Sequence, residues 1–267
     1  MYSFEYHNPA SQADAEELLQ TSADPSLLAG GQTLLPTLKH RLAEPSDLID
    51  LKGIEGLSGI REESGNIVIG ATTTHCEVSE SMLVAKHIPA LSTLAGGIGD
   101  QQVRHRGTIG GSVANNDPAA DYPAGCVGIG ATIRTNRREI AADDFFEDLF
   151  ETALEDGEMI LAVSFPIPDQ AAYIKFPNPA SRYALVGVML SKTGGDVRVA
   201  VTGAGSEGVF RDNRIEAALT KNFSADAIDG SGAEVTEIVS DIHASAEYRI
   251  HLIGEMARRA VNAASES

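Results

Sequence analysis

Residues 98–123 constrain the fold most, because they form one long segment rich in Gly, Asn, Asp and Pro with little hydrophobic periodicity. A loop of this length inside a compact domain is usually either functional or disordered. Ile109, Val113 and several alanines are interspersed through the segment, and such apolar side chains favour an ordered conformation. We therefore expect a folded segment with a functional role.

The segment contains a glycine pair, Gly110-Gly111, between the hydroxyl side chains of Thr108 and Ser112. A second pair, Gly30-Gly31, stands between a short apolar strand and a helical pattern. Glycine pairs let the backbone adopt positive φ and approach a ligand closely. A following helix offers unpaired N–H groups and the positive end of its dipole, which suit a phosphate. Two such loops could hold a diphosphate from both sides, although a single Gly-Gly turn is more often structural. Neither loop matches the sequence fingerprint of a P-loop or of a Rossmann fold.

Apolar patterns in the rest of the chain predict an α+β fold. Strands are expected at 47–51, 67–69 and 159–165. Helices are expected at 11–20, 88–97, 212–220 and 244–263. Thr193-Gly194-Gly195 separates the apolar runs 183–191 and 196–202, which predicts a hairpin. Pro166-Ile167-Pro168 marks the expected boundary between an N-terminal domain and a smaller C-terminal one.

Charge and cysteine content exclude several classes of protein. The 267 residues carry a formal net charge of −18, which disfavours binding to DNA or RNA. Cys76 and Cys126 cannot fill the four thiolate positions of an iron–sulfur cluster, so we expect two buried free thiols and no metal site on this chain. The N-terminus lacks the pattern of a signal peptide, and no apolar stretch is long enough to span a bilayer. A cytoplasmic location is expected.

The long segment also carries a resemblance. Its string Ile98–Ser112 (IGDQQVRHRGTIGGS) and the continuation Asn116–Asp121 (NDPAAD) resemble the FAD-binding signature of the medium, flavoprotein subunits of molybdenum hydroxylases. That family includes the medium subunit of carbon monoxide dehydrogenase and the flavin portion of xanthine dehydrogenase. Other stretches resemble the family in the same order, so the similarity covers nearly the whole chain: 29–36, 158–161, 173–175, 183–188 and 243–249.

The resemblance implies a domain organisation. Residues 1–168 would form an α+β FAD-binding domain of the two-subdomain PCMH or VAO-like type, with subdomains at about 1–55 and 56–168. Residues 169–267 would form a small α+β C-terminal domain of the carbon monoxide dehydrogenase flavoprotein type, with a β-hairpin sheet and helices.

The resemblance also implies a noncovalent FAD site. The two glycine loops would hold the pyrophosphate through backbone N–H groups and the hydroxyls of Thr33, Thr108 and Ser112. Asp121 would accept hydrogen bonds from the ribose, and Lys175 would lie close to the flavin and stabilise its anionic reduced form. Ile98 and Ile160 would be apolar neighbours of the cofactor. The implied cofactor-binding residues are Leu28, Ala29, Gly30, Gly31, Gln32, Thr33, Leu34, Ile98, Thr108, Ile109, Gly110, Gly111, Ser112, Asp121, Ile160 and Lys175.

The chain departs from its relatives in places. Ser112 stands where some of them have Asn. Residues 178–182 replace a more basic stretch, so the resemblance does not determine which residues face the electron-acceptor side of the flavin. His75 and His105 lie near the predicted loops, but the resemblance to a noncovalent family gives neither one the role of a covalent tether.

The implied function is electron transfer within a heterotrimer. A large subunit with the molybdenum cofactor would oxidise the substrate, and the [2Fe–2S] clusters of a small subunit would deliver electrons to FAD on this chain for an external acceptor. No catalytic side chain is expected here, and the family assembly is a dimer of heterotrimers. The substrate, the final acceptor (NAD, quinone, dioxygen or a carrier protein) and the retention of FAD by the isolated chain stay open.

Two alternatives remain beside this interpretation. A stand-alone flavin oxidase or dehydrogenase of the same fold would need a larger substrate domain than residues 169–267. A flavin-free assembly subunit is disfavoured by the intact glycine loops and by Asp121.

Overall fold

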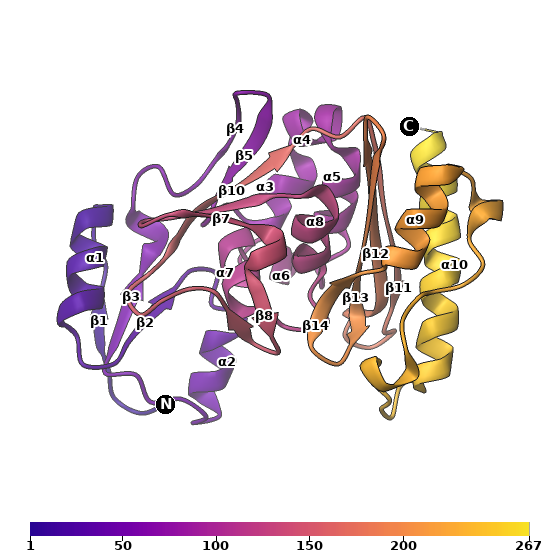
Figure 1. Ribbon diagram of the computed structural model, residues 1–267. Helices are drawn as coiled ribbons and strands as arrows, with labels where there is room; N and C mark the ends of the chain where they lie inside the picture. The colour runs from indigo at the N-terminus through magenta and orange to yellow at the C-terminus, as the bar shows by residue number, and fades with distance from the viewer. Residues whose placement is uncertain (267) are drawn as a thin grey trace.

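Three larger β-sheets follow one another along the molecule in the computed structural model, which describes residues 1–266 (Figure 1). A parallel sheet lies at the N-terminal end, an antiparallel sheet in the middle, and a second antiparallel sheet near the C-terminal helices. Helices α3 to α8 lie between the second and third sheets (Figure 1). The predicted α+β fold is confirmed.

The N-terminal sheet is built from short parallel strands in the order β1-β3-β2. Ser11 caps the first helix by accepting a hydrogen bond from the Asp14 N–H at 3.1 Å, as its position before an apolar stripe predicts. The elements of this part are β1 (Glu5–His7), α1 (Gln12–Thr21), β2 (Pro25–Leu28), α2 (Leu34–Lys39), β3 (Asp47–Asp50) and the 3₁₀ turn η1 (Leu51–Gly53).

The middle sheet has the order β4-β5-β10-β6-β7. Ile67, Val68 and Ile69 of β5 are fully buried, which explains why this strand reads as a continuous apolar run. The elements of this sheet, with the small hairpin β8–β9 that follows it, are β4 (Ile60–Glu63), β5 (Asn66–Gly70), β6 (Thr132–Thr135), β7 (Glu139–Ala141), the 3₁₀ turn η2 (Ala142–Asp144), β8 (Phe146–Asp148), β9 (Glu151–Thr152) and β10 (Ile160–Pro166).

Residues 98–123 are mostly helical rather than one long loop. Asp100 caps α6 and Thr108 caps α7, each through its side chain. The sequence hides these helices because α6 and α7 are too short for a visible period, and every residue of α8 is buried, which removes the polar face. The helices of this layer are α3 (His75–Glu80), α4 (Met82–His87), α5 (Pro89–Gly96), α6 (Gln101–Arg104), α7 (Ile109–Asn115) and α8 (Asp121–Ile129).

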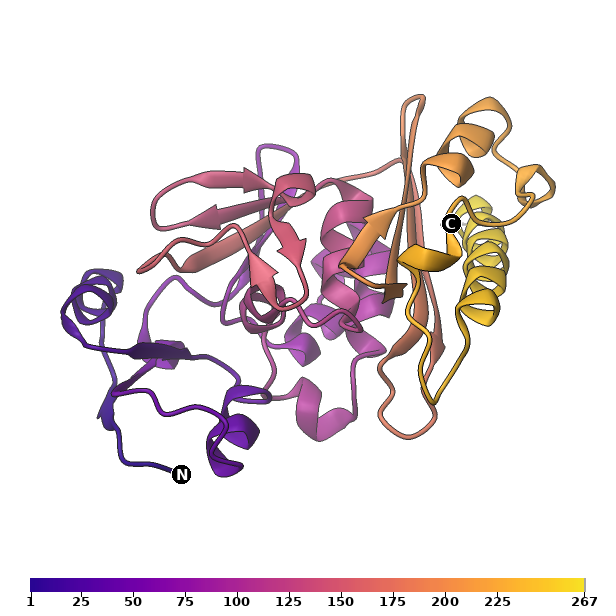
Figure 2. The ribbon, with the colours of Figure 1, turned by 60° about the horizontal axis from the view of Figure 1, so that its bottom comes forward.

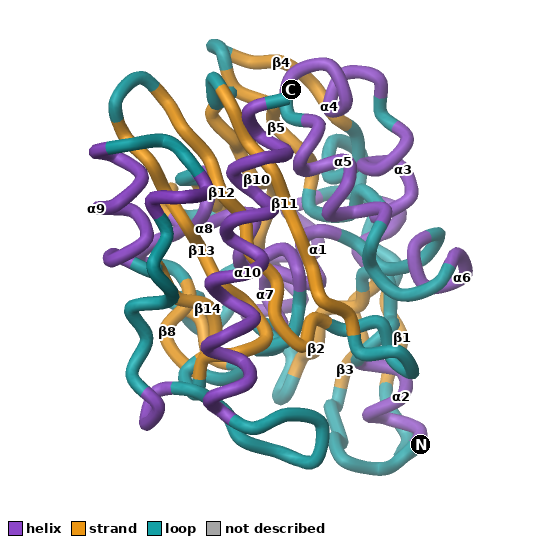
Figure 3. Tube along the Cα trace, turned by 90° about the vertical axis from the view of Figure 1, so that its right-hand side faces the viewer, coloured by secondary structure: helices purple, strands orange, loops and turns teal. Residues whose placement is uncertain are grey.

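The C-terminal sheet is covered on both faces. Helices α5 and α8 pack on one face, and α10 packs on the other (Figures 2 and 3). This explains why 184–191 of β12 is buried without the alternation of a one-sided strand. The predicted hairpin is confirmed, and the elements are β11 (Gln170–Pro177), β12 (Ala184–Thr193), β13 (Asp196–Gly205), β14 (Gly208–Arg211), α9 (Asn213–Lys221), the 3₁₀ turns η3 (Ala225–Ala227) and η4 (Val235–Glu237), and α10 (Ala246–Ser265).

Candidate functional site

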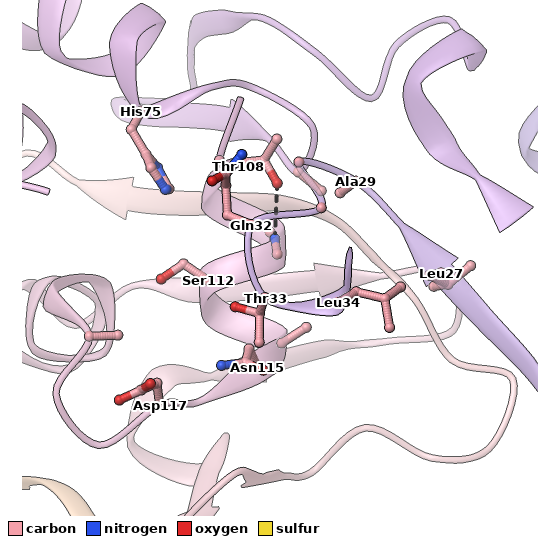
Figure 4. Close-up of a pocket in the computed structure, with 18 of the residues that line it drawn as sticks. Leu27, Ala29, Gln32, Thr33, Leu34, His75, Thr108, Ser112, Asn115 and Asp117 are labelled. Carbon is pink, nitrogen blue, oxygen red and sulfur yellow. Dashed lines mark hydrogen bonds between the residues drawn. The ribbon is translucent and has the colours of Figure 1, made fainter. Parts of the chain in front are cut away.

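One cavity of about 680 Å³ lies where the N-terminal sheet, the middle sheet and the α6–α8 segment meet. This volume is in the range of small-molecule and cofactor sites. Figure 4 shows side chains from both glycine loops converging on it. The cavity is lined by most of the residues that the sequence singled out, namely Ala29, Gly30, Gly31, Gln32, Thr33, Leu34, Ile98, Thr108, Gly110, Gly111, Ser112, Asp121 and Ile160.

The first glycine loop presents unpaired backbone donors. The N–H groups of residues 30–34 donate no hydrogen bond within residues 1–266, whereas the next one, of Leu35, is bonded to the Gly31 carbonyl at 3.2 Å. Gly31 makes this geometry possible with a φ of 70°, which a residue with a side chain rarely adopts. Consecutive unpaired amides at such a turn form an anion-binding concavity. The loop can therefore hold a phosphate without a cationic side chain.

The second glycine segment offers little of its backbone, because within residues 108–112 only the Thr108 N–H lacks a hydrogen-bond partner in the described chain. The N–H groups of Ile109 and Gly110 are bonded to backbone carbonyls at 3.1 and 2.8 Å, and those of Gly111 and Ser112 are bonded to Thr108 at 3.2 and 3.0 Å. These four N–H groups close helix α7 and join it to the backbone that follows β5, so the segment has the Thr108 amide and its hydroxyls left for a diphosphate, and its pyrophosphate role stays a prediction. The hydroxyls of Thr108 and Ser112 still face the cavity (Figure 4).

The two loops touch backbone to backbone. A Cβ placed on Gly30 would lie 2.2 Å from the Arg106 carbonyl oxygen and 2.7 Å from the Cα of Gly107. No side chain fits into that space, so glycine is required at position 30. This contact sets the distance between the amides of the first loop and the hydroxyls of the second.

Cationic side chains position the turn that carries Ile98. Arg104 donates to the carbonyls of Ile98 and Gly99 at 3.0 and 3.1 Å, and Arg182 donates to the carbonyl of Gly99 at 3.2 Å. Lys175 donates to the carbonyl of Gly97 at 2.8 Å. These bonds hold Ile98 at the wall of the cavity.

Lys175 lies behind the cavity wall rather than in it. Its ammonium group is 2.8 Å from Oδ1 of Asp121, and it is not among the cavity-lining residues of the described chain. The Lys175 charge is thus paired inside the protein, and its expected position close to the flavin stays a prediction. Leu28 and Ile109 also lie outside the lining, and the Ile109 side chain is fully buried in the core.

Asp121 begins helix α8 and is buried, with 4% of its surface exposed. Burial raises the pKa of its carboxyl group, while the charge of Lys175 and the hydrogen bond from the Tyr173 hydroxyl oppose that rise. Both partners contact Oδ1. Oδ2 is the oxygen that remains for a ligand in the cavity.

His75 is a cavity residue to which the sequence assigned no role. It is 5% exposed, it begins helix α3, and its ring points toward the cavity beside Thr108 (Figure 4). Burial and the charge of Arg104 lower its pKa to about 4. The ring is therefore neutral at physiological pH. Nothing in the pattern around a lone histidine at the start of a helix predicts this burial.

Other lining residues were not predicted from the sequence either. They come from β2, η1, the end of α7 and the segment after it, the segment before β10 and the turn before β12. They include Leu27, Leu51, Asn115, Asp117, Glu158, Met159, Arg182 and Tyr183. Within residues 1–266 no group of three His, Cys, Asp or Glu side chains gathers in a way that could hold a metal ion. None of the helices in the same part of the chain is long and apolar enough to cross a membrane.

Comparison with known families decides the family of this chain. The family model described as the FAD binding domain in molybdopterin dehydrogenase matches residues 2–168, and the model described as the CO dehydrogenase flavoprotein C-terminal domain matches residues 171–264. The chain belongs to this family. It is an oxidoreductase flavoprotein of the carbon monoxide dehydrogenase and xanthine dehydrogenase type, and its cofactor is FAD.

Individual relatives match over almost their full length. The carbon monoxide dehydrogenase medium chain of Hydrogenophaga pseudoflava is 36% identical over 98% of this chain and 96% of its own length. The nicotine 6-hydroxylase medium subunit of Paenarthrobacter nicotinovorans is 37% identical over 96% of this chain and 95% of its own length. A solved structure of reconstituted CO dehydrogenase from Oligotropha carboxidovorans superimposes with a TM-score of 0.89 at 35% identity, covering 99% and 98% of the two chains.

Proposed function

We propose that this chain is the FAD-binding electron-transfer subunit of a heterotrimeric molybdenum hydroxylase. A small subunit would deliver electrons from its [2Fe–2S] clusters, and a large subunit with the molybdenum cofactor would oxidise the substrate. The run of unpaired amides at 30–34 beside a cavity of about 680 Å³ is the observation that carries the proposal. When bound, FAD supplies the change between one-electron and two-electron transfer.

The residues of the cavity fit FAD in three places. The amides of 30–34 suit the pyrophosphate, with the hydroxyls of Thr33, Thr108 and Ser112 around it. Oδ2 of Asp121 can accept hydrogen bonds from ribose hydroxyls, because Oδ1 already has both protein partners. Ile98 and Ile160 supply apolar walls for flat rings. These roles are part of the proposal.

The wider assembly is also proposed. Residues 1–168 are assigned to FAD and residues 169–267 to the C-terminal domain, and the complex is a dimer of heterotrimers. Lys175 contributes indirectly, because its bonds to Gly97 and Asp121 brace two parts of the cavity wall. The cytoplasmic location stays a prediction from the sequence.

The visible absorption spectrum of the purified chain, before and after denaturation, tests the proposal. Flavin bands, with FAD released on denaturation, are the expected result, followed by co-purification of iron–sulfur and molybdenum subunits. A colourless chain that takes up no added FAD contradicts it. Turnover of a small alcohol or amine by the chain alone would instead favour a self-contained flavin oxidase.

A further inference from the structure

His75 occupies a place that packing alone does not explain. Its ring contacts the ring of Tyr122 on one side, with centroids 5.4 Å apart. On another side lies Gly107, where a Cβ would be only 2.6 Å from Nε2 of His75. The remaining side of the ring faces the cavity, beside Thr108 and Ser112 (Figure 4). The protein thus makes room for an imidazole at the cavity wall.

Neither ring nitrogen of His75 has a hydrogen-bond partner within residues 1–266. Nδ1 is completely buried. Since the side chain nevertheless lines the cavity, Nε2 is the nitrogen that can meet a ligand. Buried polar groups of proteins are nearly always hydrogen-bonded, so an unpartnered imidazole that faces a cavity indicates a partner in the ligand.

The surroundings select the kind of ligand group. Apolar groups lie close by: a Cβ on Gly107 would meet both His75 and the Val103 carbonyl, and Gly99, the chain neighbour of Ile98, packs against the Val103 side chain. The unpaired amides of the first glycine loop already provide for a phosphate. A neutral, flat ring with polar atoms on its edge suits this site better.

The proton on the ring belongs on Nε2. If Nδ1 carried it, a buried N–H donor would be left unpaired, which is rarer in proteins than an unpaired acceptor. Nε2–H therefore faces the cavity as a donor. The polar edge of an isoalloxazine ring, with its two carbonyl oxygens and imine nitrogens, offers the matching acceptors.

We propose that His75 is a cofactor-contacting residue, and that its Nε2–H donates a hydrogen bond to a polar edge atom of the isoalloxazine ring of FAD. This inference rests on the proposed function. The bond holds the ring in the cavity, and it stabilises reduced FAD more than oxidised FAD, because reduction adds electron density to those edge atoms. His75 thereby raises the reduction potential of the bound flavin.

The test compares His75→Leu with His75→Gln in the full chain, purified with any subunits that accompany it. The readouts are the dissociation constant for FAD and the midpoint potential of the bound flavin. One net hydrogen bond corresponds to about three- to tenfold in affinity. We expect His75→Leu to bind oxidised FAD that much more weakly. A further three- to tenfold loss for reduced FAD lowers the potential by about 15–30 mV, since a tenfold difference between the two redox states equals about 30 mV for two electrons. His75→Gln, which keeps a neutral N–H donor, should restore most of both values.

Two matched controls separate this role from packing. Tyr122→Phe removes the neighbouring hydroxyl, and His105→Gln changes an exposed histidine of the same segment that is bonded to the Gln101 carbonyl at 2.7 Å. Neither residue lines the cavity, so both variants should keep the wild-type potential. If His75→Leu does not fold, His75→Phe keeps a ring against Tyr122 while removing both nitrogens.

Three results overturn the inference. The first is a wild-type potential and affinity in His75→Leu or His75→Phe, which leaves the proposed function intact. The second is an equal defect in the Leu and Gln variants, which indicates packing alone. The third is a wild-type chain that takes up no FAD, which overturns the proposed function as well.

Discussion

Replacing Gly30 by Ala tests the contact between the two loops. The new Cβ would lie 2.2 Å from the Arg106 carbonyl oxygen, and real Cβ atoms essentially never come closer than 3.0 Å, so the loops must separate by at least 0.8 Å there. Overpacking of this kind costs about 1–3 kcal/mol. The same movement displaces the unpaired amides of 30–34, and losing one hydrogen bond to a charged phosphate costs about 1.5 kcal/mol or more, which is about tenfold in affinity.

We therefore expect Gly30→Ala to bind FAD at least about tenfold more weakly and to unfold at a lower urea concentration. FAD affinity is measured from the quenching of flavin fluorescence, and stability from urea melts of the apoprotein. Gly195→Ala is the matched control, because a Cβ there has no atom within 4 Å and the φ angle is not positive. Wild-type affinity and stability in Gly30→Ala would refute the backbone contact between the loops.

Three further substitutions probe stability. Folding lowers the pKa of His75 from 6.5 to about 4, so the folded state keeps its full stability above pH 6.5 and loses part of it as the pH falls toward 4. His75→Leu should make the free energy of unfolding, measured by urea melts, depend less on pH across that range. Lys175→Met leaves the buried Asp121 carboxylate without its cation and should lower the free energy of unfolding by about 3–5 kcal/mol, most of which Asp121→Asn should restore in the double variant. Full stability in the single variant would contradict the ion pair. Arg249→Met removes hydrogen bonds to two backbone carbonyls and to an aspartate, so the apoprotein should melt at a lower temperature while its FAD affinity is unchanged. A loss of FAD affinity together with the loss of stability would show that this arginine is coupled to the cavity.

Local signals in the sequence predicted much of the fold. Ser11 before an apolar stripe placed the first helix, and Thr193-Gly194-Gly195 placed the hairpin, because caps and turns depend on a few neighbouring residues. The Gly30-Gly31 turn was found for the same reason, whereas Gly110-Gly111 lies inside α7 and not in the expected loop. The helices inside 98–123 were not, because they are short or buried on all sides and so have no amphipathic period.

The candidate site was predictable only in part. Glycine loops are visible in the sequence, but the partner of a charged side chain is a matter of tertiary structure. Lys175 and Asp121 are far apart in sequence, and their ion pair arises only when β11 meets the start of α8. The burial of His75 depends in the same way on Tyr122 and Gly107. The residue types in the glycine segments predict a phosphate-containing ligand. Only the tertiary structure determines which polar atoms are left without a protein partner and can therefore bind that ligand.

The unpaired amides of 30–34 also determine how this protein should respond to salt. A phosphate site built from lysines attracts its ligand over a long range, and added salt weakens that attraction. Here the short-range donors are uncharged, while the chain as a whole carries −18, so the long-range field repels a doubly charged dinucleotide. Salt screens the repulsion and leaves the contacts inside the cavity almost unchanged. FAD should therefore associate faster, and bind no more weakly, as ionic strength rises toward that of a cell.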